Sequence, residues 1–125
     1  EGGAYLPFKS ARWEAFYRGQ IQRILKAAKK HHVQVLWVGV PNMRKNKLNQ
    51  GIHYLNTLYR SEAQKAGIHY LPTNALFGYD DHRYHKYATT AAGKKIAVRT
   101  KDGIHFTRSG QKRIANKILS LIQVQ

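Results

Sequence analysis

The chain has 125 residues, a length typical of one domain with a modest core. It contains no cysteine, which excludes a disulfide framework and a thiolate zinc site. Its 22 lysine and arginine residues against six acidic residues give a formal net charge of +16, and no apolar run is long enough to predict a transmembrane segment.

So large a positive charge attracts polyanions, such as nucleic acid, acidic polysaccharide or an anionic membrane surface. The basic residues are scattered through every segment of the chain and do not form one cluster. One interpretation is that they are solubilising surface residues, and the role of the charge stays open; we do not expect nucleic acid as a partner.

The first predicted element is an amphipathic helix that begins after Ser10, a suitable N-cap, and runs to about Lys30. Its apolar residues fall at spacings of three and four: Trp13, Phe16, Tyr17, Ile21, Ile24, Leu25 and Ala28. The next segment, 33–40, is nearly continuous in apolar residues and rich in β-branched ones. Such a run is typical of a parallel strand covered on both faces, and Pro41 ends it.

A second helix is expected from Asn49, as its N-cap, to Gly67, as its C-terminal stop. A short strand over residues 68–71 follows at once, so that strand, crossover helix and strand make a right-handed βαβ unit. With two strands, the segment 33–40 would keep one unpaired edge, although its composition favours neighbours on both sides. The sequence therefore predicts half of a doubly wound α/β domain.

The last third of the chain predicts a hairpin and a helix. Residues 84–90 and 96–100 are the expected strands of a small hairpin, joined by residues 91–95. Thr107 is a candidate N-cap for a final helix to about residue 123. The apolar residues of that helix fall at helical spacing: Ile114, Ile118, Leu121 and Ile122.

Asp102 and His105 lie three residues apart in a turn that ends where this last helix begins. Such spacing can place both side chains on one side of the backbone. The carboxylate can then bond one ring nitrogen of the histidine and leave the other nitrogen as a general base. The alternative is structural: a turn aspartate and a partly exposed histidine that bond to nearby backbone groups.

One further cluster has the composition of a metal site, namely Asp80, Asp81, His82 and His85. Its segment is irregular and lacks a second clear ligand pair, so we interpret it as a surface cluster and expect no metal site. No cofactor is expected either.

Two blocks of the sequence resemble the SGNH (GDSL-type) hydrolase superfamily. Residues 102–110, Asp-Gly-Ile-His-Phe-Thr-x-x-Gly, resemble its last conserved block, in which an Asp-x-x-His pair completes a Ser-His-Asp triad. Residues 35–44, with Trp13 and Tyr17 on the preceding helix, resemble a bacterial cell-envelope branch of that superfamily. The similarity runs from about residue 6 to residue 121.

The resemblance implies a flavodoxin-like three-layer α/β/α fold, present here as its C-terminal portion, with residues 1–125 as one partial domain. It implies that Asp102 is the orienting acid and His105 the general base. The family's nucleophilic serine, in a Gly-Asp-Ser motif, and its oxyanion-hole glycine and asparagine have no match in this chain. We therefore expect them in a missing N-terminal half, and expect this chain alone to be inactive.

The resemblance implies a parent serine esterase that hydrolyses an O-acyl or O-acetyl ester on a cell-envelope glycan, in the periplasm or cell envelope. Met43, Arg44 and Phe106 are expected at the rim of its pocket, beyond the carboxyl ends of the strands. Arg44 is either a partner for an anionic substrate group or a solvated loop arginine. Two other functions stay open: a non-catalytic SGNH-like module that holds an acidic glycan, and a basic nucleic-acid-binding domain.

Overall fold

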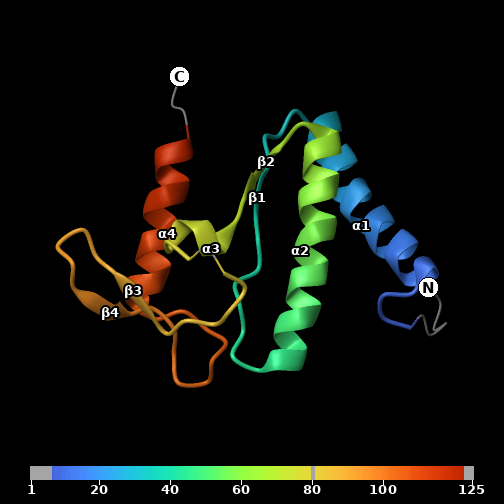
Figure 1. Ribbon diagram of the computed structural model, residues 1–125. Coiled ribbons are helices and arrows are strands. Elements are labelled where there is room, and N and C mark those ends of the chain that lie inside the picture. Colours follow the sequence, from blue (N-terminus) through green and yellow to red (C-terminus); the bar gives the residue numbers. More distant parts are fainter. Residues whose placement is uncertain (1–6, 80, 123–125) are drawn as a thin grey trace. The chain divides into compact units, whose positions relative to one another are not determined.

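The computed structural model describes residues 7–79 and 81–122 and shows a mixed α/β chain, as the sequence predicts (Figure 1). In chain order its elements are α1 (Ala11–Lys30), β1 (Leu36–Val38), α2 (Asn46–Ala66), β2 (His69–Leu71), α3 (Thr73–Leu76), β3 (Tyr87–Thr89), β4 (Lys95–Ala97) and α4 (Arg108–Leu121). The described residues fall into two compact units, one within Glu1–Trp37 and Thr57–Tyr70, the other within Val38–Asn56 and Leu71–Gln125.

In the first unit, α1 begins where the sequence predicts. The Ser10 hydroxyl accepts a hydrogen bond from the backbone N–H of Trp13 at 3.1 Å, and Ile21 and Leu25 are buried. The ring of Trp13 stacks on that of Tyr17, whose hydroxyl lies 2.6 Å from the hydroxyl of Tyr59 on α2. This face of α1 therefore packs through aromatic rings as well as aliphatic side chains.

A buried carboxylate joins the two helices of the first unit. Glu62 on α2 is 2% exposed and accepts hydrogen bonds from Arg18 on α1 at 2.8 Å and from Gln22 at 3.1 Å. Lys65, one turn further along α2, reaches the same carboxylate at 3.3 Å. The carboxylate is thus compensated by charge and by hydrogen bonds, which is what makes its burial tolerable.

The strand expected over residues 33–40 is much shorter in the structure, where β1 covers only Leu36–Val38. Val33 lies just beyond α1, and its N–H donates to the carbonyl of Ala28 in the last turn of that helix at 2.8 Å. At the other end, the side-chain amide of Asn56 bonds both the N–H and the carbonyl of Val40, at 2.9 and 2.8 Å. At both ends of the expected strand, backbone groups are therefore hydrogen-bonded to other parts of the chain and do not pair with a neighbouring strand.

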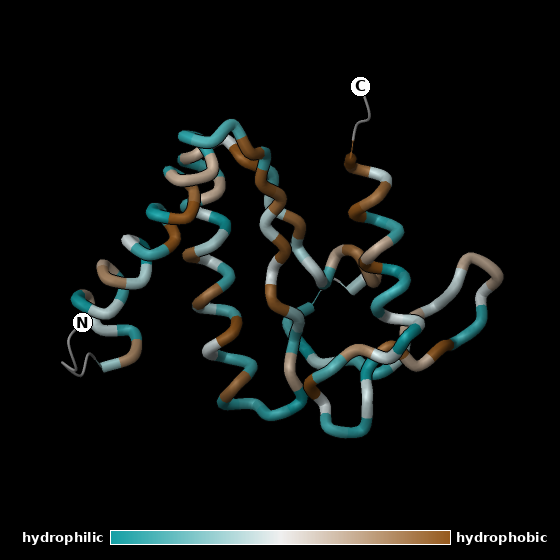
Figure 2. The backbone as a smooth tube through the Cα atoms, turned by 180° about the vertical axis from the view of Figure 1, so that it is seen from behind, coloured by the Kyte–Doolittle hydropathy of each residue, from teal (hydrophilic) through white to brown (hydrophobic). Residues whose placement is uncertain are grey.

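Strands β1 and β2 form a two-stranded sheet, and the chain runs through both in the same direction (Figure 1). The N–H of Gly39 continues the pairing by donating to the carbonyl of Leu71 at 2.8 Å. Within the described ranges 7–79 and 81–122 no third strand joins this sheet, and the residues of β1 are half-buried. Brown and teal segments alternate along the connecting helix α2 (Figure 2), as expected of an amphipathic helix.

Helix α2 begins earlier than predicted, at Asn46 instead of after Asn49. Asn49 lies inside the helix, and its side-chain oxygen accepts from the N–H of Met43 at 2.7 Å. It therefore supports the loop before the helix without being its N-cap. Gly67 follows the last helical residue with φ +71°, which agrees with its predicted role as the stop.

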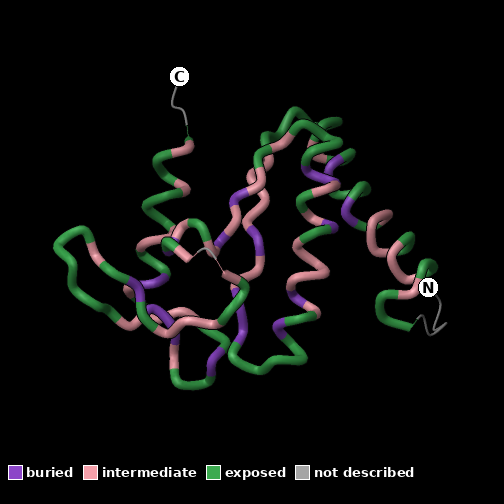
Figure 3. Tube along the Cα trace, viewed as in Figure 1, coloured by how far each residue is buried: buried purple, intermediate pink, exposed green. Residues whose placement is uncertain are grey.

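The second unit holds the predicted hairpin, with β3 and β4 antiparallel and Ala88 opposite Ile96. Residues 91–94 of the loop that joins the two strands are exposed, while Thr90 is half-buried (Figure 3). Phe77, Ala88 and Val98 form its core, with Phe106 and Ile114 packed against them. Helix α4 begins at the predicted N-cap, Thr107, whose hydroxyl accepts from the N–H of Gly110 at 3.2 Å. Across the part of the chain that is described, no helix is long and apolar enough to cross a membrane.

Candidate active site

Asp102 and His105 lie in a tight backbone turn between β4 and α4, in the second unit. The N–H of Thr100 donates to the carbonyl of His105, and the N–H of Thr107 donates to the carbonyl of Val98, both at 2.9 Å. Residues 98–107, here called the dyad turn, therefore fold back on themselves in antiparallel fashion. Helix α4 follows directly, so the turn is fixed by strand-like pairing on one side and a helix cap on the other.

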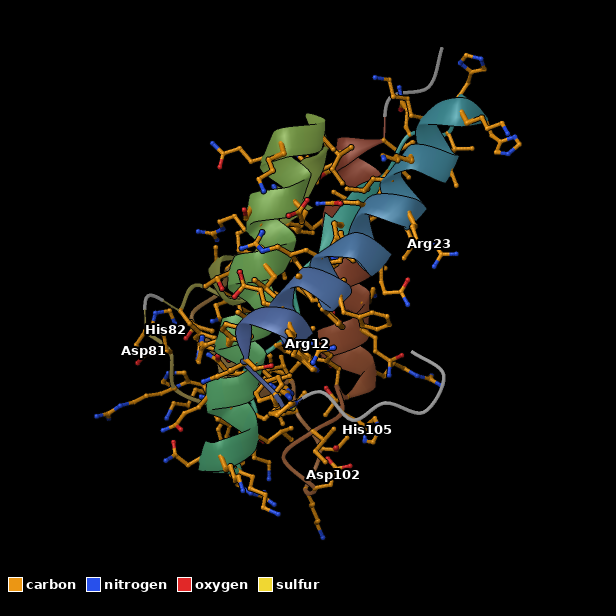
Figure 4. The ribbon with its side chains drawn as sticks, turned by 90° about the vertical axis from the view of Figure 1, so that its right-hand side faces the viewer. Arg12, Arg23, Asp81, His82, Asp102 and His105 are labelled. Atoms are coloured by element: carbon orange, nitrogen blue, oxygen red, sulfur yellow. The ribbon has the colours of Figure 1, made fainter. Side chains whose placement is uncertain are left out.

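The structure brings the two side chains together as the sequence predicts (Figure 4). His105 Nδ1 lies 2.6 Å from Asp102 Oδ2. The other carboxylate oxygen accepts from the Thr100 hydroxyl at 2.5 Å and from the N–H groups of Ile104 and His105 at 2.9 and 3.1 Å. The carboxylate thus receives four hydrogen bonds from its own turn.

These hydrogen bonds decide the charge of Asp102. The Thr100 hydroxyl first, then His105 and the two backbone N–H groups, hold the pKa of the Asp102 carboxyl far below its ordinary value. Asp102 is therefore ionised at neutral pH and can only accept hydrogen bonds. It follows that Nδ1 of His105 carries the proton in this contact.

The second ring nitrogen of His105 is available for chemistry. Its Nε2 makes no hydrogen bond within residues 7–79 and 81–122, and the side chain is 74% exposed. With Nδ1 protonated, a neutral ring presents its lone pair at Nε2. A carboxylate behind Nδ1 stabilises the imidazolium that forms when Nε2 takes a proton, which is the arrangement of a general base.

Comparison with known proteins places the chain in a family but assigns it no activity. A family model described as "Protein of unknown function (DUF459)" matches residues 1–121. The chain belongs to this family. No curated protein matches the sequence of this DUF459 chain.

Of the three residues expected at the pocket rim, the structure brings Arg44 to the dyad turn of the DUF459 chain. Its N–H donates to the carbonyl of Gly103 at 3.2 Å, and its guanidinium donates to the carbonyl of Lys101 at 2.7 Å. Met43 is buried, and Phe106 is half-buried and stacks on Phe77 with ring centroids 5.4 Å apart. Arg44 therefore supports the turn, while Phe106 contributes to the core beneath it.

Gly103 is where the dyad turn of the DUF459 chain depends most closely on a glycine. Its φ is +72°, and a Cβ at this position would lie 2.6 Å from the Cβ of Arg44. Gly103→Ala is therefore expected to lower the free energy of unfolding by about 2–3 kcal/mol, because backbone strain and a collision act together. Urea unfolding followed by circular dichroism measures this loss.

Gly93→Ala is the matched control, because Gly93 has φ +83° and open space where its Cβ would lie. This variant is expected to lose only about 1 kcal/mol, from backbone strain alone. Equal losses of unfolding free energy in Gly103→Ala and Gly93→Ala would show that Arg44 is not in close contact with Gly103.

A second Asp–His pair lies on a separate loop of the same unit. His85 Nε2 is 2.9 Å from Asp81 Oδ1, and this contact is the main cause that lowers the pKa of the Asp81 carboxyl. Figure 4 shows Asp81 and His82 well away from Asp102 and His105. Among the described residues of the DUF459 chain no three ligands gather as a metal site, while Asp80 lies outside them.

Sequence reasoning missed one residue of this site, Arg99. Its side chain is 4% exposed, and its guanidinium donates to the carbonyls of Asn42 and Ile104, both at 2.6 Å. The only sequence signal was an arginine directly after the apolar residues 96–98. Nothing in that pattern indicates which distant carbonyls it reaches in the DUF459 chain.

Proposed function

We propose that this chain carries the acid–base half of a serine esterase site of the SGNH (GDSL-type) kind. One observation carries the proposal: His105 Nδ1 is held 2.6 Å from an ionised Asp102 while Nε2 is exposed and has no partner among the described residues. The Asp-x-x-His block at residues 102–110 and the block at residues 35–44, which resemble that superfamily, give further support.

In the proposed reaction, Nε2 of His105 accepts the proton of a serine hydroxyl as its oxygen attacks the ester carbonyl. The imidazolium, stabilised by Asp102, then gives this proton to the leaving alkoxide as the ester C–O bond breaks and the acyl-enzyme forms. A water molecule next gives a proton to Nε2 and attacks the acyl group. The proton returns to the serine oxygen as the acid is released.

The serines of this chain are poor candidates for the nucleophile. Ser10 caps α1, Ser61 accepts from Arg18, and Ser120 donates to the carbonyl of Lys117. Ser109, the remaining one of the four serines in the sequence, lies in the first turn of α4. None follows a strand as the nucleophile of an α/β hydrolase elbow does. We therefore assign the nucleophile and the oxyanion donors to a part of the protein outside these 125 residues.

The proposal includes a specific fold, the flavodoxin-like three-layer α/β/α domain. In a flavodoxin-like three-layer domain, β1 and β2 would be inner strands and further parallel strands would extend their sheet. The half-buried residues of β1 and the absence of a third partner strand among the described residues support this arrangement. The dyad turn would then face the serine beyond the carboxyl ends of the strands.

The proposed substrate class is an O-acyl ester, with O-acetyl groups on a cell-envelope glycan as the preferred case. The location in the periplasm or cell envelope rests on the same resemblance as the substrate. The net charge of +16 supports an acidic glycan, because a positive field raises the local concentration of a polyanion.

The test is acetate release from an O-acetylated acidic glycan by the full-length gene product that contains this chain. The proposal predicts catalytic release of acetate, with turnover beyond one equivalent. Binding of the glycan without release would favour a non-catalytic module. Tight binding to DNA with a steep salt dependence, together with no acetate release, would favour a nucleic-acid-binding domain.

A further inference from the structure

A buried arginine of the dyad turn, Arg99, holds the turn in place through hydrogen bonds. Arg99 is 4% exposed, and burial is the main cause that lowers the pKa of its guanidinium. A buried charge normally requires a carboxylate partner. Within the described part of the chain, however, Arg99 forms no ion pair, and its hydrogen-bonding partners are carbonyl oxygens and a sulfur.

These partners come from two segments, the distant loop after β1 and the dyad turn to which Arg99 itself belongs. One guanidinium nitrogen donates to the carbonyl of Asn42, in the loop after β1, at 2.6 Å. A second donates to the carbonyl of Ile104 at 2.6 Å and to the sulfur of Met43 at 3.6 Å, and the third, Nε, donates to the carbonyl of His105 at 3.4 Å. The planar guanidinium thus joins the loop after β1 to the dyad turn with bonds of fixed relative direction.

Aromatic rings hold the same guanidinium in place. Its carbon lies 5.0 Å from the ring centroid of Tyr84 and 4.7 Å from that of Phe106. The quadrupoles of the two rings attract the positive charge and compensate part of its desolvation. The Arg99 guanidinium therefore has a fixed position, which it needs in order to hold the dyad turn in one conformation.

The decisive detail is the peptide group that joins Ile104 to His105. Its carbonyl oxygen accepts from Arg99 at 2.6 Å, and its N–H donates to Asp102 Oδ1 at 3.1 Å. A trans peptide group is planar, with its C=O and N–H pointing in opposite directions. Arg99 and Asp102 therefore hold one rigid group from its two sides, and each hydrogen bond polarises the other.

We infer that Arg99 is a positioning residue: by fixing this peptide group, it sets the place where Asp102 and His105 meet. Without Arg99 the peptide group can rotate, and Asp102 Oδ1 loses a backbone donor. The contact between Asp102 and Nδ1 then loosens, so the His105 proton distributes between the two ring nitrogens. The catalytic consequence of this inference rests on the proposed function, whereas the geometry of the pair does not.

The experiment compares Arg99→Met with Arg113→Met by nitrogen-15 NMR of the His105 ring. Arg113 is a suitable control because it also lies over a core ring, that of Phe77, and donates to a backbone carbonyl, that of Thr89 at 3.2 Å. Spectra are recorded at alkaline pH, because the two tautomers are distinguished in the neutral form of an imidazole ring. The chemical shifts of Nδ1 and Nε2 then report which nitrogen holds the proton.

The wild-type protein and Arg113→Met are expected to show protonated Nδ1 as the main form. Arg99→Met is expected to lose that pattern and to show a mixture of both tautomers. A carboxyl titration by carbon-13 NMR is expected to show the midpoint of Asp102 moving up toward the ordinary value of about 3.9 in Arg99→Met alone. A folded Arg99→Met with the wild-type tautomer and the wild-type Asp102 midpoint would overturn the inference.

Arg99→Lys covers the case in which Arg99→Met does not fold. Lysine keeps the positive charge but lacks the planar fork that reaches both segments at once, so a partial shift to the mixed tautomer is expected. An unchanged tautomer in folded Arg99→Lys would equally overturn the inference. These spectra need no substrate, so a protein that responds to Arg99 but releases no acetate would contradict the proposed function and leave the positioning role standing.

Discussion

Replacing His105 with alanine in the full-length gene product is expected to lower kcat/KM for ester hydrolysis by about 10⁴- to 10⁶-fold. The substitution removes the group that takes the serine proton and returns it to the leaving alkoxide, and triad members act as a unit. Asp102→Asn is expected to cost about 10⁴-fold, because a neutral amide neither fixes the Nδ1–H tautomer nor stabilises an imidazolium. Steady-state kinetics on an O-acetylated substrate measures both losses.

His85→Ala is the matched control for this prediction. His85 belongs to the second Asp–His pair, with Asp81 at 2.9 Å, and lies on a different loop. Its removal is expected to leave kcat/KM within about twofold of the wild-type value, since it takes no part in the proposed reaction. An active His105→Ala protein, or an equally inactive His85→Ala protein, would contradict the assignment of the dyad.

Replacing Glu62 with alanine is expected to lower the free energy of unfolding by about 2–4 kcal/mol at pH 7. Removing the buried partner of an ion pair takes away much of the compensation of the other charge. The expected loss of unfolding free energy is smaller than for an ion pair with both partners buried. The reason is that the Arg18 side chain is 24% exposed and also bonds Glu14 at 2.9 Å. Urea unfolding measures the difference.

The same carboxylate gives the stability of the protein a defined pH dependence. Burial on its own raises the pKa of Glu62, but hydrogen bonds from Arg18, Gln22 and Lys65 outweigh burial and bring it below its ordinary value. A lowered folded-state pKa stabilises the protein above the unfolded-state pKa of about 4.3. That stabilisation is lost as the pH falls through the folded-state value, and Glu62→Ala should lack this acid-side loss.

Lys65→Met is the control for Glu62, because Lys65 reaches the same carboxylate with a side chain that is 63% exposed. An exposed ion pair contributes little, so a loss of at most about 1 kcal/mol is expected. If Glu62→Ala and Lys65→Met lost the same small amount, the buried carboxylate would not hold α1 and α2 together.

Local signals in the sequence predicted the parts of the fold that depend on near neighbours. Ser10 and Thr107 cap their helices three residues ahead, and Gly67 ends α2 with a positive φ. Asp102 and His105 meet within one turn for the same reason, since every donor to the carboxylate lies within residues 100–105. Such contacts join residues close in sequence, so spacing can predict them.

The parts that were missed depend on residues far apart in the chain. The predicted strand over residues 33–40 was too long because Asn56, 16 residues after Val40, takes the backbone groups at its end. The role of Arg99 could not be predicted, because its main partner outside the dyad turn, Asn42, lies 57 residues away. Helix α3 was missed for a local reason, since its four residues are too few to produce a hydrophobic period.

The most direct test of the central claim is covalent labelling of the full-length gene product with a serine-directed phosphonate, followed by mapping of the labelled peptide. We predict one labelled serine outside these 125 residues, and loss of the label in His105→Ala, because the hydroxyl needs Nε2 as its base. Labelling of Ser61 or Ser109, labelling that persists without His105, or no labelled serine at all would contradict the central claim.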